Sequence, residues 1–262
     1  MSEFFIAIIL GVLEGITEFI PISSTGHLIL VGDALSFTGP IADTFSVAIQ
    51  LGAILAVVVL YPDFFKKALT PKHWLSRENR LILTAIAPAM VLGFLIYDLI
   101  KEHLFGPTTV MGALFVGGLV MILVEKRLGD TGNTTSFETL TFKQALTVGI
   151  CQCAALWPGM SRSASTIVGG LISGMSHTFA AEFSFIIAVP VMVAAVGYDL
   201  LKSAAILNAH SLMLIGVGFL VSFVVAVASI LTFLKLLSRF KLIPFALYRI
   251  VLSLILMGIM FV

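Results

Sequence analysis

The sequence predicts an all-α polytopic membrane protein, in which six transmembrane helices accompany two re-entrant helical hairpins in an inverted-topology repeat. Three observations predict this fold. Hydrophobic residues make up 59% of the 262 residues and charged residues only 11%, against about 25% in soluble domains. Six apolar stretches approach the ~20 residues that cross a bilayer. Two further stretches contain a proline break and polar side chains, which lipid tolerates only where the freed backbone lines a cavity or meets protein.

These elements follow one another in a regular order. Each interrupted segment precedes three apolar spans, and Pro88 is expected to kink the second span. The first interrupted segment covers about 3–33, and its spans cover about 43–61, 81–99 and 107–124. The second interrupted segment covers about 143–175, and its spans cover about 180–198, 211–234 and 244–262.

The two halves of the chain, about 1–124 and 139–262, resemble each other weakly at one fixed offset of 138 residues, which pairs Glu14 with Gln152 and Ser23 with Ser161. Because three spans are an odd number, the second half is expected to insert upside down. Repeats of this kind place their binding site near the midplane of the bilayer. We therefore expect a single membrane domain, 1–262, in which the two hairpins meet.

Basic residues in the loops test this layout. With alternating spans and hairpins that return to their own side, eleven loop lysines and arginines fall on one side and two on the other. By the positive-inside rule the rich side is cytoplasmic, so both termini face outward. The rich side holds Lys66, Lys67, Lys72, Arg77, Arg80, Lys126, Arg127, Lys143, Lys235, Arg239 and Lys241, and the other side holds Lys101 and Lys202.

The first interrupted segment carries acidic and hydroxyl side chains into an apolar setting. Glu14 and Glu18 are four residues apart and share one face of a helix. Pro21 stops that helix, and Ser23 or Ser24 can cap the next one. Ionisable groups inside a membrane are functional by default. The following turn, from Ser23 through Thr25 and Gly26 to His27, offers a helix N-terminus that suits an anion.

The second interrupted segment offers a matching anion site. Pro158-Gly159 breaks the helix, and Ser161, Ser163 and Thr166 crowd the first turn of the next one. The free N–H groups and positive dipole end of a helix N-terminus suit phosphate. Arg162 adds a planar fork that binds phosphate in two places. The alternative is that Arg162 only forms a structural ion pair with an acid.

The two carboxylates require a cation beside an anion site. Glu14 and Glu18 together with phosphate oxygens make a hard-ion site for Mg²⁺ or Ca²⁺, and the sequence leaves the choice of metal open. Three attackers on phosphorus are possible: Ser24, His27, or a water activated by Glu18 or the metal. We favour Ser24, with His27 assisting as a proton carrier.

The net charge, the cysteines and the other histidines do not point to nucleic-acid binding, a zinc site or a disulfide. A net charge of +1 gives no electrostatic case for nucleic acid. Cys151 and Cys153 fit no usual zinc spacing and make a poor disulfide, so they are expected to pack as small residues. The four other histidines are expected to be solvated at the surface: His73, His103, His177 and His210.

Nearly the whole chain resembles the undecaprenyl-diphosphate phosphatase family, also called bacitracin-resistance protein. The resemblance rests on Glu14-x-x-x-Glu18, on Ser23-Ser24-Thr25-Gly26-His27 and on the run from Pro158 to Thr166. It implies hydrolysis of undecaprenyl diphosphate to undecaprenyl phosphate and phosphate, which recycles the carrier for cell-wall synthesis and confers bacitracin resistance. It also implies a divalent cation, a multi-pass protein of the bacterial inner membrane, and an active site open to the periplasmic side.

The candidate residues fall into three roles. The catalytic candidates are Ser24, His27, Glu18 and Arg162, and the metal candidates are Glu14 and Glu18. The candidates for binding the diphosphate are Ser23, Thr25, Gly26, Ser161, Arg162, Ser163 and Thr166. The rival function is a transporter or flippase of prenyl-phosphate lipid, because inverted repeats and broken helices are transporter architecture. A homodimer is compatible with the sequence, which leaves open both the oligomeric state and the selectivity for prenyl chain length.

Overall fold

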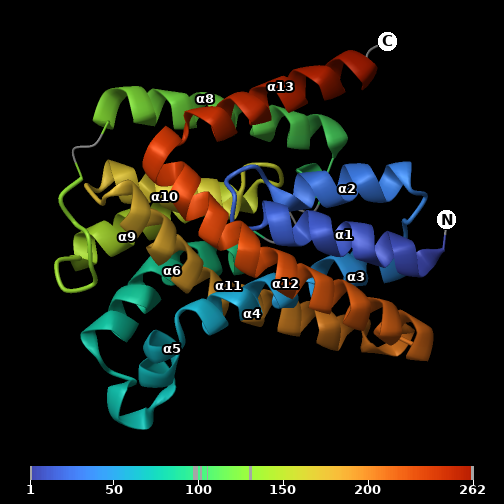
Figure 1. The fold of residues 1–262 in the computed structure, drawn as a ribbon, viewed down its shortest axis with the longest axis horizontal. Helices are drawn as coiled ribbons and strands as arrows, with labels where there is room; N and C mark the ends of the chain where they lie inside the picture. The colour runs from blue at the N-terminus through green and yellow to red at the C-terminus, as the bar shows by residue number, and fades with distance from the viewer. Residues whose placement is uncertain (1, 97–99, 101, 105, 130–131, 261–262) are drawn as a thin grey trace. The chain divides into compact units, whose positions relative to one another are not determined.

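The computed structural model describes residues 2–96, 100, 102–104, 106–129 and 132–260, and these residues form helices joined by short connections (Figure 1). In this part of the chain there is one isolated bridge, between Thr134 and Met175, and no sheet. The α-helices are α1 (Glu3–Thr17), α2 (Ser24–Ala34), α3 (Pro40–Ala48), α4 (Gln50–Leu60), α5 (Pro62–Leu69), α6 (Arg77–Leu95), α8 (Pro107–Leu128), α9 (Phe142–Gln152), α10 (Arg162–Ile172), α11 (His177–Ser203), α12 (Ala209–Phe240) and α13 (Ile243–Met260). Three 3₁₀ turns accompany them: η1 (Pro71–His73), η2 (Cys153–Leu156) and η3 (Ala204–Ile206).

Six helical segments of the described residues are long and apolar enough to cross a membrane, which confirms the six predicted spans. The first is divided at Ile49 into α3 and α4, although Ile49 keeps helical backbone angles. Several helices run beyond the apolar stretch, since backbone hydrogen bonding continues into polar residues. The spans are Pro40–Leu60, Arg77–Leu95, Thr108–Leu128, His177–Ile206, Ala209–Phe240 and Ile243–Met260. The predicted positions 97–99, 261–262 and the loop residue Lys101 lie outside the described residues.

Both interrupted segments consist of two short helices around a break, as predicted. α1 has 15 residues and α2, α9 and α10 have 11 each, which is too short to span the ~30 Å hydrocarbon core. α2 packs against α1, and α10 packs against α9. The breaks contain Pro21 in the first pair and Pro158-Gly159 in the second. That each pair re-enters its own side of the membrane stays a prediction.

The described chain divides into two compact units, each built from segments of both sequence halves. The first unit comprises Met1–Ile20, Ser24–Pro62 and Ala188–Phe233. The second unit comprises Pro21–Ser23, Asp63–Ile187 and Leu234–Val262. The break residues Pro21–Ser23 therefore pack with the second unit, while the helices on either side of them belong to the first.

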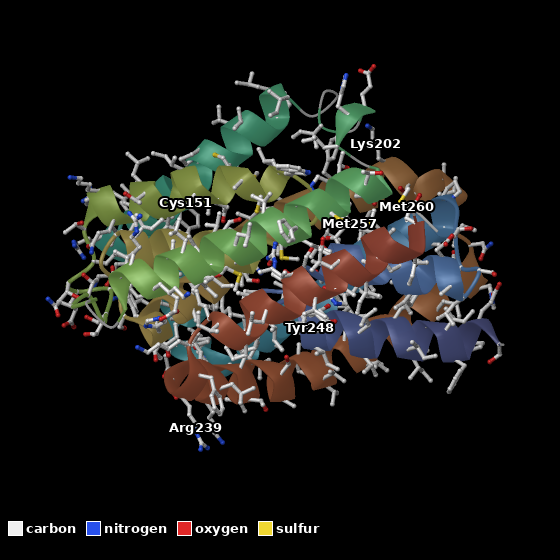
Figure 2. All side chains as sticks on the ribbon, turned by 90° about the horizontal axis from the view of Figure 1, so that it is seen from above. Cys151, Lys202, Arg239, Tyr248, Met257 and Met260 are labelled. Carbon is white, nitrogen blue, oxygen red and sulfur yellow. The ribbon has the colours of Figure 1, made fainter. Side chains whose placement is uncertain are left out.

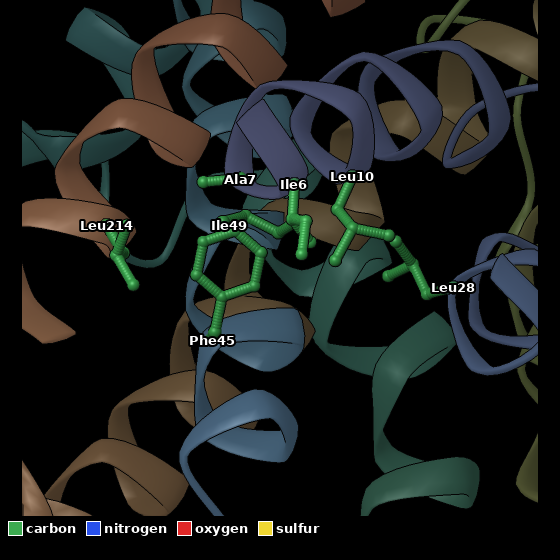
Figure 3. Close-up of a cluster of buried hydrophobic side chains, with 7 residues drawn as sticks. All are labelled: Ile6, Ala7, Leu10, Leu28, Phe45, Ile49 and Leu214. Atoms are coloured by element: carbon green, nitrogen blue, oxygen red, sulfur yellow. The ribbon is translucent and has the colours of Figure 1, made fainter. Parts of the chain in front are cut away.

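The first unit is held together by an apolar core and by close helix contact. Figure 3 shows this core, which consists of Ile6, Ala7, Leu10, Leu28, Phe45, Ile49 and Leu214. Gly11 and Gly15 let α1 approach α12, because a Cβ atom at either glycine would lie 2.7 Å from a backbone oxygen of α12. Small residues allow such close packing in membrane proteins, where burial from water does not drive helices together. The Ser229 hydroxyl adds a hydrogen bond of 3.0 Å to the Ile16 carbonyl.

In the second unit α13 lies beside α8, and α9 packs between α6 and α10. Gly118 permits the first of these contacts, since a Cβ atom there would lie 2.7 Å from Ile250 on α13. Figure 2 shows that Arg239 extends outward from the end of α12, and Tyr248 of α13 is exposed. Cys151 and Cys153 are free thiols, and Cys151 packs on Gly169 of α10, as predicted.

The prediction of a solvated His177 is wrong. His177 is only 6% exposed, and its Nε2 atom lies 3.0 Å from both carboxylate oxygens of Glu125. The Leu242 N–H also donates to Glu125. The pair is buried because it joins the end of α8, the start of α11 and the turn before α13. Of the other histidines, His103 and His210 are exposed, as predicted, whereas His73 is half-buried.

Candidate functional site

The first break brings acids and a hydroxyl together. α1 ends at Thr17, Glu18 continues it with helical angles, and α2 begins at Ser24. Glu14 is fully buried and Glu18 is 8% exposed. Their four-residue spacing places both carboxylates on one face of α1. Two acids are thus enclosed where the helix ends, which is costly unless the protein or a ligand compensates their charge.

The Ser24 hydroxyl donates a hydrogen bond of 2.6 Å to Oε2 of Glu18. Both side chains are buried, and an O–H···O⁻ bond of this length is of the strong, charge-assisted kind. A carboxylate so placed can accept the serine proton as the oxygen attacks. His27, one turn further along α2, is also buried. The other members of this turn are Thr25, which is half-buried, and Gly26, which is buried.

The serines that precede α2 and α10 adopt the same unusual backbone conformation. Ser23 has φ 74° and Ser161 has φ 73°, in the left-handed region that non-glycine residues rarely enter. Such conformations cost about 1–3 kcal/mol and concentrate at functional sites. The two serines are the pair that the 138-residue offset aligns, and the inverted repeat itself stays a prediction.

The start of α10 is a cluster of buried hydroxyls. Ser161 is the N-cap, and its Oγ accepts the Ala164 N–H at 3.2 Å. The Ser161 and Ser163 hydroxyls lie 3.0 Å apart. Thr166 is 1% exposed, and its hydroxyl donates to the Arg162 carbonyl. Together with the positive end of the helix dipole, these groups suit a phosphate.

Arg162 is anchored by α11. Its Nη1 donates to the carbonyl of Ser184 at 3.0 Å and to the Ser184 hydroxyl at 3.3 Å. The Ser184 hydroxyl also lies 2.6 Å from that of Thr166. Sequence reasoning missed Ser184 as a site residue. Its sequence signals are its place in the run Ala181–Phe185, which the family resemblance includes, and its pairing with Ser46 at the 138-residue offset.

The second unit also contains a buried amide. Gln152 is 2% exposed, and neither its Oε1 nor its Nε2 has a hydrogen-bond partner among the described residues. A buried polar group without partners costs about 1–3 kcal/mol. The predicted repeat aligns this residue with Glu14, so a polar position recurs at the end of α1 and of α9.

The predicted cation would find two carboxylates at this site. Within the described part, no group of three or more His, Cys, Asp or Glu side chains is close enough to hold a metal ion. Glu14 and Glu18 supply two carboxylates, the hard oxygen donors that Mg²⁺ and Ca²⁺ prefer. The residues present fit a cation whose remaining ligands are phosphate oxygens and water.

The structure therefore groups the candidate residues into two sets. Glu14, Glu18, Ser24, Thr25, Gly26 and His27 belong to the first unit, and Ser23, Ser161, Arg162, Ser163 and Thr166 belong to the second. Two buried carboxylates, one of which accepts a hydrogen bond from a serine, form one set, and an arginine with hydroxyls forms the other. These groups define a polytopic membrane protein equipped to handle a phosphorylated substrate.

The chain belongs to the bacitracin resistance protein BacA family, whose model matches residues 7–255. It is 47% identical over 259 residues to undecaprenyl-diphosphatase 1 of Bacillus thuringiensis strain Al Hakam, and the match covers 97% of each chain. It is 46% identical to undecaprenyl-diphosphatase 1 of Bacillus anthracis, again over 97% of each chain. It is also 49% identical over 257 residues to the undecaprenyl-diphosphatase of Maridesulfovibrio salexigens, with 97% of each chain covered.

Proposed function

We propose that this chain hydrolyses undecaprenyl diphosphate to undecaprenyl phosphate and inorganic phosphate in a bacterial membrane. The hydrolysis would recycle the lipid carrier for cell-wall synthesis and remove the target of bacitracin. The observation that carries the proposal is the buried hydrogen bond from Ser24 to Glu18, in a chain matched over 97% of its length by proteins named undecaprenyl-diphosphatase. A carrier that only bound phosphate would have no need of a serine with a carboxylate poised to accept its proton.

The proposed reaction has two steps. Ser24 Oγ attacks the terminal phosphorus while Glu18 accepts the hydroxyl proton, and the bond from that phosphorus to the bridging oxygen breaks. Undecaprenyl phosphate leaves, and His27 can supply a proton to the leaving oxygen. Water then attacks the phosphoserine and gives a proton to the deprotonated His27, while Glu18 returns its proton to Ser24 Oγ as the bond from phosphorus to Oγ breaks. Inorganic phosphate is released, and Ser24, Glu18 and His27 return to their starting protonation states. Overall, one water is consumed and one phosphoanhydride bond is cleaved.

We further propose that the second set of residues acts on the same diphosphate. Arg162 and the N–H groups at the start of α10 bind phosphate oxygens as negative charge shifts toward the leaving group. A divalent cation held by Glu14 and Glu18 would supply charge neutralisation when bound. Ser161, Ser163 and Thr166 orient the oxygens through their hydroxyls.

Phosphate release in detergent tests hydrolysis against lipid transport. Purified protein in detergent has no two sides, so a flippase would give no product there. We expect stoichiometric release of inorganic phosphate and undecaprenyl phosphate from undecaprenyl diphosphate. If the protein moves the lipid across vesicle membranes but releases no phosphate in detergent, the flippase function is correct.

We also propose that the protein resides in the inner membrane with its active site open to the periplasm. The eleven-to-two distribution of loop basic residues supports this orientation. An alkaline phosphatase reporter fused after residue 262 should be active. A cytoplasmic fluorescent reporter that matures at the same position would contradict the orientation and the inverted repeat.

A further inference from the structure

The proposed function does not account for Arg249, a fully buried arginine on α13. An arginine side chain has five N–H donors, and all five are used on backbone carbonyls of the second unit. Nε donates to Leu114 at 3.3 Å, Nη1 to Pro21 at 3.2 Å and Met160 at 2.9 Å, and Nη2 to Ala113 at 3.2 Å and Gly159 at 3.0 Å.

The acceptors of Arg249 lie at both helix breaks. Pro21 belongs to the break between α1 and α2, and Gly159 and Met160 belong to the break before α10. The offset of 138 residues that aligns the sequence halves also aligns Pro21 with Gly159. One guanidinium thus binds equivalent carbonyls of the two interrupted segments.

Each of these carbonyls lies just before a strained serine. Pro21 and Gly159 are two residues before Ser23 and Ser161, whose φ angles are 74° and 73°. A broken helix leaves carbonyls without their helical donors, and inside a membrane such groups cost several kcal/mol each unless satisfied. Left-handed serines likewise persist only where their surroundings enforce them. The N–H donors of Arg249 satisfy the carbonyls at the breaks, and they help to hold Ser23 and Ser161 in their left-handed conformation.

We propose that Arg249 is a positioning residue, which holds the two breaks in the conformation that presents Ser24 and the start of α10 to the substrate. The inference rests on the proposed function for its catalytic consequence. With all five donors engaged, Arg249 would have to release a carbonyl to bind phosphate, which separates its role from that of Arg162. Lysine cannot replace it, because an ammonium has three donors and no planar fork.

Two neighbouring glycines of α8 provide a matched test. A Cβ atom at Gly117 would clash with Nη2 of Arg249, so Gly117→Ala displaces the guanidinium without changing its charge. A Cβ atom at Gly118 would press on Ile250 and the Ala246 carbonyl instead. Gly118→Ala therefore disturbs the same pair of helices without touching Arg249.

The experiment combines hydrogen exchange with turnover on the purified full chain in detergent. We expect Arg249→Lys and Gly117→Ala to accelerate amide exchange in peptides that cover 19–24 and 157–163, while peptides within α12 keep the wild-type rate. Turnover of undecaprenyl diphosphate should fall by about 10-fold or more in both variants. Turnover of Gly118→Ala should stay within about threefold of the wild-type value. Its melting temperature should be no higher than that of Gly117→Ala, so that a difference in turnover does not reflect a difference in stability.

Three results would overturn the proposal. In the first, exchange at both breaks is unchanged while turnover is lost, which would make Arg249 a direct substrate ligand. In the second, Arg249→Lys keeps wild-type turnover and exchange. In the third, amide exchange rises uniformly over the chain, which would mean that Arg249 stabilises the whole fold rather than the two breaks. Because exchange needs no catalysis, a wild-type protein that releases no phosphate would refute the proposed function while leaving this arm of the test intact.

Discussion

The Ser24 hydroxyl lies 2.6 Å from Oε2 of Glu18 and donates its hydrogen bond to that carboxylate. This relationship narrows the choice among Ser24, His27 and water as the attacking group. A serine is a weak nucleophile until a base takes its proton, and the structure places a buried base within reach. The geometry supports Ser24 as the nucleophile, with Glu18 rather than His27 as its base.

Glu18→Gln tests this base. The amide is isosteric with the carboxylate and can still accept a hydrogen bond from Ser24, but it cannot take the proton. We expect turnover to fall by about 10²–10⁴-fold, the usual contribution of a general base, while the protein folds and binds substrate. The measurement is kcat in detergent with saturating divalent cation. Turnover within a few fold of wild type would leave Ser24 without its base.

Glu14→Gln separates metal binding from proton transfer. If Glu14 acts only through a cation, loss of its carboxylate weakens the affinity for the metal, and a higher metal concentration should restore activity. We expect a chelator to abolish activity, and Mg²⁺ or Ca²⁺ to restore it at a concentration about 10-fold or more higher in Glu14→Gln than in wild type. The measurement is a metal titration of turnover. Full activity in the chelated wild-type protein would exclude this role for both acids.

Arg162→Lys tests the phosphate fork. Lysine keeps the positive charge but loses the planar pair of donors, so we expect a loss of at least ~2 kcal/mol in transition-state stabilisation, about 30-fold in kcat/KM. Ser184→Ala is the matched control, because it removes the hydroxyl contacts with Arg162 and Thr166 but leaves the Ser184 carbonyl to hold Nη1. The kcat/KM of that control should fall by less than about fivefold. Equal losses would assign Arg162 to packing against α11.

The buried pair of His177 and Glu125 should support folding rather than catalysis. His177→Ala removes the imidazole from the buried Glu125 carboxylate and leaves it the Leu242 N–H, so the variant should lower the free energy of unfolding by about 3 kcal/mol. His210→Ala is the control, since it breaks an exposed contact of 2.5 Å with Glu3 and should cost less than about 1 kcal/mol. Thermal denaturation in detergent compares the two. Similar melting temperatures for both variants would contradict the assigned role.

Features that depend on neighbouring residues could be predicted from the sequence. Pro21 and Pro158-Gly159 break helices wherever they occur in a helical run, so both breaks were recognisable. The six spans followed from the length of their apolar stretches. The four-residue spacing of Glu14 and Glu18 places both carboxylates on a shared face by helix geometry alone.

Features that depend on distant partners were beyond the sequence. Arg249 reaches carbonyls 89 and 228 residues away, and backbone carbonyls carry no sequence signature. His177 contacts Glu125, 52 residues away in the chain, whereas its place just after the second interrupted segment suggested a surface residue. Ser184 meets Arg162 from another helix. A single sequence ranks residues by type and local spacing, whereas these roles arise from the packing of α8, α11 and α13.

A single-turnover reaction tests the central claim that Ser24 carries the phosphate during hydrolysis. The wild-type protein is mixed with undecaprenyl diphosphate labelled in its terminal phosphate and quenched within one turnover. We predict labelled phosphoserine at Ser24 in the wild type and its absence in Ser24→Ala, which should also lose at least about 10²-fold in turnover. If no phosphoprotein forms, ¹⁸O from water enters the released phosphate in that turnover, and Ser24→Ala is only mildly impaired, then water attacks directly and the account is wrong.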